Sequence, residues 1–305
     1  MNRVRKVLVG VDFSPCSRSA LVQAARIASR RDAELHLLHV LHPMVVRDLA
    51  EATSADANEL RGHLVADARA ELERLVTGLE IDRKTVTLHV GVGRPETQVL
   101  RRAEELPASL LVLGVYGSSG ASVGASLLAT RCVRRARTRV LLVNEDQHGP
   151  FRHVVAAVDF SETSSLALAQ AIEVARADRA ALRVVHVYAG PWNQFHYRAP
   201  TAESSPAFRA QYIARLQGLL DGQLEAHRDA LGDLADVRAD LVEHQGHGHG
   251  IIEYAKAETA DLVVLGTEAG VRLRYLLLGS TAERVLREVP CSILAVKPSR
   301  DDVAA

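Results

Sequence analysis

Short, almost entirely apolar runs alternate with stretches of helical periodicity along the whole chain. The first run covers 7–11 and a similar run covers 154–158. Runs of this kind are typical of strands that are buried on both faces of a parallel sheet. After the second run, apolar residues recur at helical spacing: Leu168, Ala171, Ile172 and Ala175. Ser14 and Ser161 stand where the N-caps of the following helices belong.

The same alternation continues through the second half of the chain. Its patterns predict strands at 182–187, 239–243, 261–265 and 292–296, and helices at 250–258 and 280–288. With the first strand, its helix and a longer loop-and-helix region, this makes five strands and four helices. Such alternation predicts an α/β fold with an open, doubly wound parallel sheet and helices on both faces.

The two halves of the chain repeat one another. KVLVGVDFS near the start aligns with HVVAAVDFS from His153, which pairs Asp12 with Asp159 and His39 with His186. Both pairs have the same offset (159 − 12 and 186 − 39 both give 147). A polar stretch with glycine and proline separates the halves. We therefore predict two tandem five-stranded domains, at 1–147 and 148–305.

Composition narrows the class of protein. The chain has 305 residues, 48% of them hydrophobic, and 37 basic residues balance 37 acidic ones. A neutral chain of this kind favours neither a nucleic acid nor a membrane surface as partner. It has no apolar run of about 18–20 residues, and its first residues lead directly into a predicted strand. The three cysteines form no C-x-x-C pair. We therefore expect a cytoplasmic protein.

Candidate ligand-binding residues gather at the carboxyl ends of the predicted strands in the second half, where open α/β sheets bind ligands. They are Asp159, the turn at 266–270 and the helix start at 279–281. Glycines allow a phosphate to approach the backbone, helix-start N–H groups favour an anion, and Ser280 and Thr281 add hydroxyl groups. This arrangement predicts a cradle for a nucleotide triphosphate. The alternative is a capping box from Ser280 to Glu283, which needs no ligand.

Several other chemistries lack their motifs in this sequence. There is no G-x-x-x-x-G-K-[ST] and no G-x-G-x-x-G after the first strand, which excludes a P-loop enzyme and argues against a dinucleotide site. No Ser/His/Asp or Cys/His arrangement repeats in both halves, so we predict no catalytic residues.

The two VDFS segments, the two HV strand ends and LGTEAGVRLRYLLLGSTAERVLREVPCSILAV resemble the universal stress protein family. The likeness spans the chain twice, so it looks like a tandem member with Rossmann-like, adenine nucleotide alpha hydrolase-like domains. ATP-binding members carry G-x-x-G, nine residues and then G-[ST]. The resemblance implies ATP, ADP or AMP as ligand, with Mg²⁺ left open. The implied binding residues in the second domain are Asp159, Val187, Gly266, Thr267, Gly270, Gly279, Ser280 and Thr281.

Both halves depart from the family motif. In the second half, Ala269 replaces the second glycine, and Glu268 puts a carboxylate beside the expected phosphate path. In the first half, Gly114 keeps the turn, but Leu127 and Leu128 stand where Gly and Ser belong. We therefore expect one nucleotide per chain, in the second half.

The resemblance implies a stress-response regulator or sensor. Nucleotide occupancy would order the cradle and change the surface offered to an unknown protein partner. Strands 139–143 and 292–296 are expected to pair or abut, as in family dimers, giving a pseudo-dimer within one chain, with a further homodimer left open. The alternatives are a nucleotide-free interaction scaffold and a slow ATP-hydrolysing enzyme.

Other features receive structural interpretations. His39 and His186 are expected to pack against the strands, and the basic run at 131–139 is expected to be a solvated helix face. The segments 43–62 and 189–212 are expected to be variable loops, the second with Trp192. Three histidines follow a strand and could bind zinc or nickel, but a polar Gly-rich turn is the favoured interpretation and no metal ligand is predicted: His244, His247 and His249.

Overall fold

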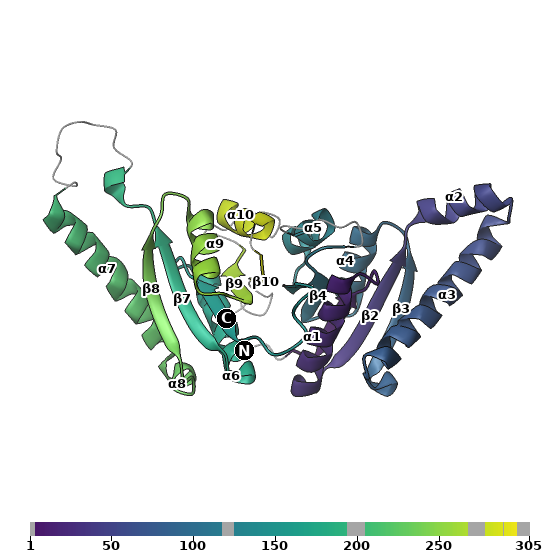
Figure 1. Ribbon diagram of the computed structural model, residues 1–305, viewed down its shortest axis with the longest axis horizontal. Helices are drawn as coiled ribbons and strands as arrows, with labels where there is room; N and C mark the ends of the chain where they lie inside the picture. The colour runs from purple at the N-terminus through teal and green to yellow at the C-terminus, as the bar shows by residue number, and fades with distance from the viewer. Residues whose placement is uncertain (1–3, 118–124, 194–204, 268–277, 289, 298–305) are drawn as a thin grey trace. The chain divides into compact units, whose positions relative to one another are not determined.

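The computed structural model describes residues 4–117, 125–193, 205–267, 278–288 and 290–297 (Figure 1). The chain divides into two compact units between Gly149 and Pro150. Each unit is an α/β fold around a parallel sheet, and the described part of each sheet has five strands.

The first unit begins with a buried strand and alternates strands with helices. In chain order its elements are β1 (Lys6–Gly10), α1 (Pro15–Arg31), β2 (Glu34–Leu41), α2 (Pro43–Thr53), α3 (Ala57–Gly78), the 3₁₀ turn η1 (Arg83–Thr85), β3 (Val86–Val92), α4 (Pro95–Glu105), β4 (Leu110–Gly114), α5 (Leu127–Arg135) and β5 (Arg139–Val143). The strand order is β3-β2-β1-β4-β5.

The second unit repeats this order. Its elements are β6 (His153–Ala157), α6 (Glu162–Asp178), β7 (Ala181–Tyr188), the 3₁₀ turn η2 (Pro191–Asn193), α7 (Pro206–Glu225), α8 (Arg228–Leu231), β8 (Val237–Glu243), α9 (His247–Ala257), β9 (Leu262–Gly266), α10 (Ser280–Glu288) and β10 (Ser292–Val296). The strand order is β8-β7-β6-β9-β10. The predicted doubly wound fold is confirmed in both units.

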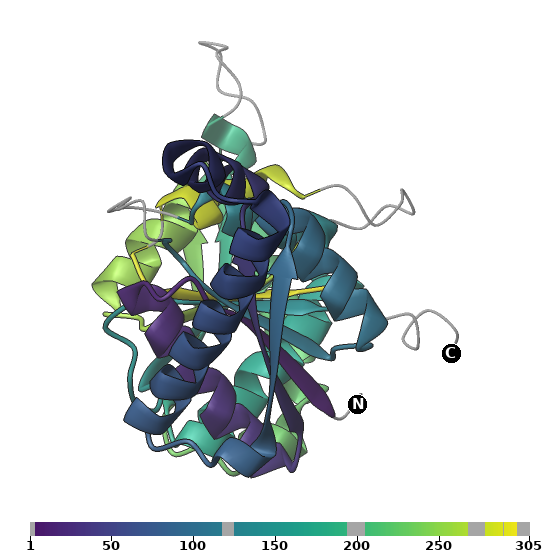
Figure 2. The same ribbon diagram turned by 90° about the vertical axis from the view of Figure 1, so that its right-hand side faces the viewer.

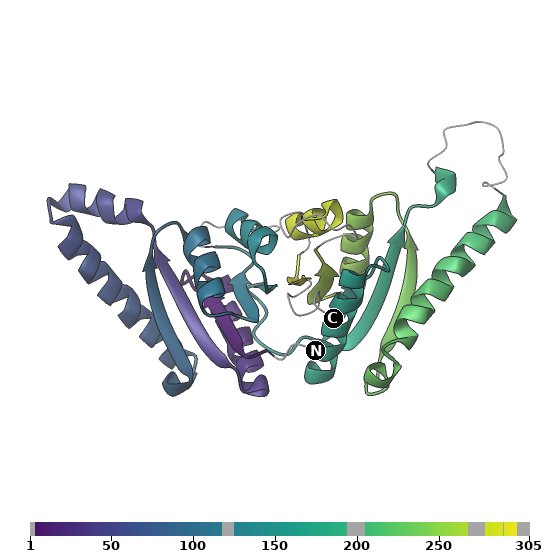
Figure 3. The same cartoon turned by 180° about the vertical axis from the view of Figure 1, so that it is seen from behind.

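Chain direction explains which helices share a face. Right-handed crossovers from β1 to β3 place α1 and α3 on one face of the first sheet, and the return through β4 to β5 places α4 and α5 on the other. Figures 1 and 3 show both sets of helices, α3 runs along β2 and β3 (Figure 2), and α4 packs against α5. The order of strands reverses between β1 and β4, and between β6 and β9, so each sheet has its switch point there.

Three expectations about element boundaries need correction. The segment 43–62 is not a loop: it forms α2 and the start of α3, because the side chains of His42 and Asp56 cap these helices. Residues 206–212 likewise belong to α7, and 194–204 lie outside the described residues. The third is the helix predicted at 250–258, which begins three residues earlier at His247.

The helices of the described residues include none that is both long and apolar enough to cross a membrane.

Candidate functional site

The turn after β6 holds Asp159 in place. Its Oδ1 accepts hydrogen bonds from the Ser161 N–H at 3.0 Å and the Ser161 hydroxyl at 2.5 Å. The Ser161 Oγ in turn accepts the Ser164 N–H at 3.1 Å, which is an N-cap of α6. Between them, Phe160 has a φ of 63°, in the left-handed region. The Asp159 carboxylate is therefore fixed at the carboxyl edge of the sheet, and the residue stays exposed.

The first unit builds the same turn. Asp12 Oδ1 accepts the Ser14 N–H at 3.1 Å and the Ser14 hydroxyl at 2.5 Å, and Ser14 caps α1. Phe13 has a φ of 65°. Sequence analysis identified both aspartates but missed this phenylalanine, although the repeated VDFS segment carried the signal.

A histidine supports each turn from the neighbouring strand. His186 Nδ1 donates to the Val158 carbonyl at 2.9 Å, and the His186 ring lies 4.2 Å from the Phe160 ring centre. Burial lowers the pKa of His186, and the nearby His247 lowers it further. His39 makes the corresponding bond to Val11 at 2.8 Å. The structural interpretation of both histidines is confirmed, and Val187 follows His186 as a buried residue.

Helix packing explains the first glycine of each turn. A Cβ on Gly266 would lie 2.9 Å from Thr163 Cγ2, and one on Gly114 would lie 2.7 Å from Cys16 Cβ. Real Cβ atoms do not approach so closely, so only glycine lets α6 and α1 lie against the strand ends. Gly266 is therefore explained without a ligand.

Thr267 links β9 to β10 and to the helix start. It is 1% exposed, its N–H donates to the Val296 carbonyl at 3.0 Å, and its hydroxyl lies 3.3 Å from the same oxygen. Its carbonyl accepts the Gly279 N–H at 3.0 Å. The Thr267 side chain therefore faces the sheet, and its main chain positions Gly279.

Gly279 is the N-cap of α10. Its carbonyl accepts the Glu283 N–H at 2.9 Å, and Ser280 is the first helical residue. The capping box from Ser280 to Glu283 is therefore wrong, because that motif needs the serine at the N-cap. Of the described residues, a Cβ on Gly279 would meet the Thr267 oxygen alone, at 3.7 Å, which is an ordinary contact. Nothing in the described residues requires glycine at this N-cap.

The first unit carries Ser126 at the same place. Val115 bonds to Val143 at 2.9 Å and Ser126 bonds to Val115 at 2.7 Å, as Thr267 does to Val296 and Gly279 does to Thr267. The alignment of Gly279 with Leu127 is therefore wrong by one residue, because the loop after Gly114 is one residue shorter. The Ser126 Oγ accepts the Ala129 N–H at 3.2 Å, which caps α5.

Two histidines of the histidine-rich segment, His247 and His249, lie in the first turn of α9, and His244 lies in the short turn before it. A Cβ on Gly248 would lie 2.7 Å from Arg284 Cβ, and one on Gly250 would lie 2.6 Å from Val187 Cγ1. These glycines let the first turn of α9 approach α10 and the end of β7. His244 Nδ1 accepts the Gly246 N–H at 2.9 Å. The described residues contain no group of three or more His, Cys, Asp or Glu side chains that could hold a metal ion.

The expected solvated helix face is borne out for the arginines at 131–135, which are exposed on α5, while 136–138 lie between α5 and β5. Arg131 and Arg135 lie 3.3 Å and 2.6 Å from the Glu96 carboxylate and join α5 to α4. Arg137, after the helix, lies 3.5 Å from Glu104.

The carboxyl edge of the second sheet brings most of the predicted residues together. Asp159 follows β6, and Val187 lies near the end of the neighbouring β7. Gly266 ends β9, on the other side of β6, and Thr267 follows it. The hydrogen bond from the Gly279 N–H to the Thr267 carbonyl places Gly279, Ser280 and Thr281 next to this strand end. The rest of the predicted turn lies outside the described residues: Glu268, Ala269, Gly270, Arg272 and Arg274.

Comparisons with known proteins agree along the whole chain. A sequence model of the universal stress protein family matches residues 3–144 and 150–297. The chain is 27% identical to a universal stress protein of Mycolicibacterium smegmatis, over 96% of this chain and 97% of the other.

Solved structures show a similar fold. A putative universal stress protein from Pseudomonas aeruginosa matches with a TM-score of 0.68 and 18% identity, over 99% of this chain and 95% of the other. A universal stress protein from Archaeoglobus fulgidus matches with a TM-score of 0.61 and 17% identity, over 97% and 99%.

Proposed function

This chain belongs to the universal stress protein family, and we propose that it is a stress-response protein whose second unit binds ATP, ADP or AMP. The nucleotide lies along the carboxyl edge of β6, β7 and β9. Asp159 and the Val187 main chain meet the adenosine end, and Gly266, Gly279, Ser280 and Thr281 meet the ribose and phosphates. Mg²⁺ can accompany the phosphates.

The observation that carries this proposal is the glycine at the start of α10. The first N–H groups of a helix have no partners within it and attract anions. In the first unit, the Ser126 hydroxyl accepts one of these N–H groups. Gly279 has no side chain to do so, and none of the described residues packs closely enough to demand a glycine there. A phosphate oxygen would supply the missing acceptor.

Occupancy of this site gives the protein its regulatory role. A bound nucleotide holds the turn after β9 and the start of α10 together, which changes the surface presented to a protein partner. We place this activity in the cytoplasm.

A nucleotide-free scaffold is the second candidate. The hydrogen bonds that Asp159 accepts from Ser161 favour it, because they explain the aspartate as part of a helix cap. The close approach of Gly266 to Thr163 also favours it, because packing alone explains that glycine.

Calorimetric titration with ATP, with and without Mg²⁺, tests the proposal. We expect one site per chain. Gly279→Arg should weaken binding by about 100-fold or more, because it blocks the helix start and the loss of two charged hydrogen bonds has that effect. The control is Leu127→Arg, one residue after Ser126, the counterpart of Gly279, where the leucine is 66% exposed and the N-cap serine is kept. This control should bind ATP normally.

Two equal sites, or unchanged binding by the Gly279→Arg protein, would contradict the proposal. If the chain binds no adenine nucleotide, the second candidate function, a nucleotide-free scaffold, is favoured. Phosphate release measured on the same samples addresses the enzyme alternative: we expect binding without turnover, and turnover that Asp159→Ala abolishes would favour a hydrolase.

A further inference from the structure

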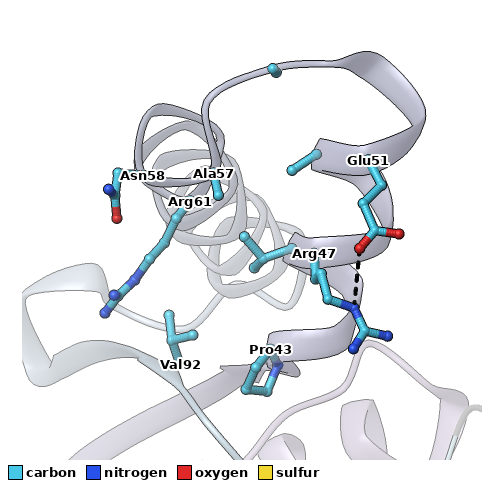
Figure 4. Close-up of a pocket in the computed structure, with 10 residues that line it drawn as sticks. Pro43, Arg47, Glu51, Ala57, Asn58, Arg61 and Val92 are labelled. Carbon is cyan, nitrogen blue, oxygen red and sulfur yellow. Dashed lines mark ion pairs between the residues drawn. The ribbon is translucent and has the colours of Figure 1, made fainter.

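A cavity opens between α2, α3 and the end of β3 in the first unit (Figure 4). Its volume is about 500 Å³, within the usual range for small-molecule sites. None of the residues proposed for nucleotide binding lines it. The lining residues are Pro43, Val46, Arg47, Ala50, Glu51, Ala55, Ala57, Asn58, Arg61 and Val92.

The walls of this α2–α3 cavity are mostly apolar. Proline, valine and alanine side chains supply six of the ten lining residues. The outer face of α2 is apolar too, since Met44, Val45 and Leu49 are 52%, 47% and 39% exposed. Such a surface favours a ligand with an apolar body.

Two arginines line the cavity, and they differ in their partners. Arg47 lies 3.1 Å from the Asp48 carboxylate and 3.7 Å from that of Glu51. Figure 4 shows its guanidinium beside Glu51, with Arg61 and Asn58 on the opposite side. Arg61 has no hydrogen-bond or ion-pair partner among the residues that the structure describes. Arg61 therefore leaves one positive charge available to a ligand.

The second unit fills the corresponding place with its own indole ring. Helix α7 stands where α3 does, and the buried Leu72 and Leu220 give the register (220 − 72 = 148). The same offset pairs Arg61 with Arg209 (209 − 61 = 148). The guanidinium carbon of Arg209 lies 4.9 Å from the centre of the Trp192 ring.

The strand ends differ in a way that matches this contrast. Glu243 ends β8 and accepts the Trp192 Nε1–H at 2.7 Å. Val92 ends β3 and has no charge. The first unit therefore lacks both the indole ring and the carboxylate that holds it, and it keeps the arginine.

We propose that the α2–α3 cavity binds an aromatic carboxylate. The flat apolar body occupies the place that Trp192 takes in the second unit, and the carboxylate pairs with Arg61 and accepts a hydrogen bond from the Asn58 amide. Val92 favours such a ligand, because a glutamate at that strand end would repel it. This site is separate from the nucleotide cradle and goes beyond the proposed function.

Methionine methyl signals provide a direct test on the full chain. The sequence has two methionines, and one of them, Met44, lies on α2. We expect 2-naphthoate to shift the Met44 signal in a saturable way, and Met44→Leu assigns that signal. The neutral analogue 2-naphthalenemethanol should bind about tenfold more weakly or worse, because it cannot pair with a guanidinium.

Matched arginine variants locate the binding. Arg61→Gln should weaken naphthoate binding at least about tenfold and remove the preference over the alcohol. Arg209→Gln, at the equivalent position of α7, should leave it unchanged. Ala57→Phe narrows the cavity without a change in charge and should weaken both ligands.

Four results would overturn the proposal: no saturable binding of 2-naphthoate, equal binding of acid and alcohol, unchanged naphthoate affinity in Arg61→Gln, or unchanged affinity for both ligands in Ala57→Phe. Circular dichroism of each variant shows that it is folded, as expected for substitutions at exposed positions.

Discussion

The two halves of this chain share the sheet topology and the turn after the first strand, which we call the shared frame, and they differ in individual contacts around it. Both have the strand order of a doubly wound sheet, an aspartate fixed by the serine two residues later, and a histidine bonded beneath that turn. They differ at the start of the last helix, where the Ser126 side chain caps α5 and Gly279, the N-cap of α10, has no side chain to do so. They differ again where Arg209 meets an indole ring and Arg61 meets a cavity.

The comparison separates residues that serve the fold from residues that serve a ligand. Asp159 and Gly266 belong to the family motif, yet the first unit explains them, because Asp12 and Gly114 make the same contacts there. Among the described residues, Gly279 has no side chain to accept a helix-start N–H as Ser126 does, and Arg61 has no ring contact like that of Arg209. Positions where one half has an internal partner and the other has none are therefore the best candidates for binding.

The largest expected effect concerns the shared frame. Gly114→Ala and Gly266→Ala should each lower the free energy of unfolding by about 1–3 kcal/mol, because the new Cβ would overlap Cys16 or Thr163. Urea unfolding followed by circular dichroism measures this. The control is Gly62→Ala in α3, where nothing lies within 4 Å and helix propensity predicts a gain of about 0.5–1 kcal/mol.

Similar losses in both halves would support the view that these glycines are structural. If Gly266→Ala is tolerated and Gly114→Ala is not, the two turns are not equivalent. Packing would then no longer explain Gly266, and a ligand would be the remaining explanation.

The second expected effect distinguishes the halves by pH. His36 and His89 lie on neighbouring strands of the first sheet, with ring nitrogens 3.2 Å apart. Arg183 and Asp240 hold the corresponding places in the second sheet. The pKa of His89 is lowered from an ordinary value of 6.5 to about 4, mainly by burial, with the charges of Arg102 and His36 contributing.

This shift destabilises the first unit in acid. Between pH 6.5 and about 4 the unfolded chain binds a proton at His89 and the folded chain does not, so stability falls as the pH falls through that window. The full shift corresponds to about 3 kcal/mol, and we expect about 2 because the ring is only half-buried. His89→Gln should flatten the pH dependence of urea unfolding over this window. His63→Gln, an exposed histidine on α3, is the control, and an equal change there would contradict the assignment to His89.

Sequence patterns predicted the frame well because its causes are local. Buried apolar runs became β1 and β6, and Ser14 and Ser161 became the N-caps that their positions indicated. Glycine was harder to interpret. The sequence does not show whether a glycine serves a turn, a ligand or close packing, and Gly248 and Gly250 serve packing inside a helix.

The wrong alignment of Gly279 with Leu127 arose from a loop length. The loop before Ser126 is one residue shorter than the loop before Gly279, and apolar periodicity does not reveal such a difference. The α2–α3 cavity could not be predicted, because it depends on how two helices pack and on where the Arg47 and Arg61 side chains lie.

The smallest expected effect is an exchange of the two caps. Ser126→Gly removes the side chain that accepts the Ala129 N–H and should cost a few tenths of a kcal/mol in urea unfolding. Gly279→Ser should gain a similar amount, because the new hydroxyl can accept the first N–H groups of α10. If a phosphate uses those N–H groups, the same substitution weakens ATP binding while it stabilises the protein. A gain in stability with unchanged ATP affinity would show that the nucleotide does not use this helix start, and opposite changes in the two quantities would identify Gly279 as the position where the second unit gives up a cap for a ligand.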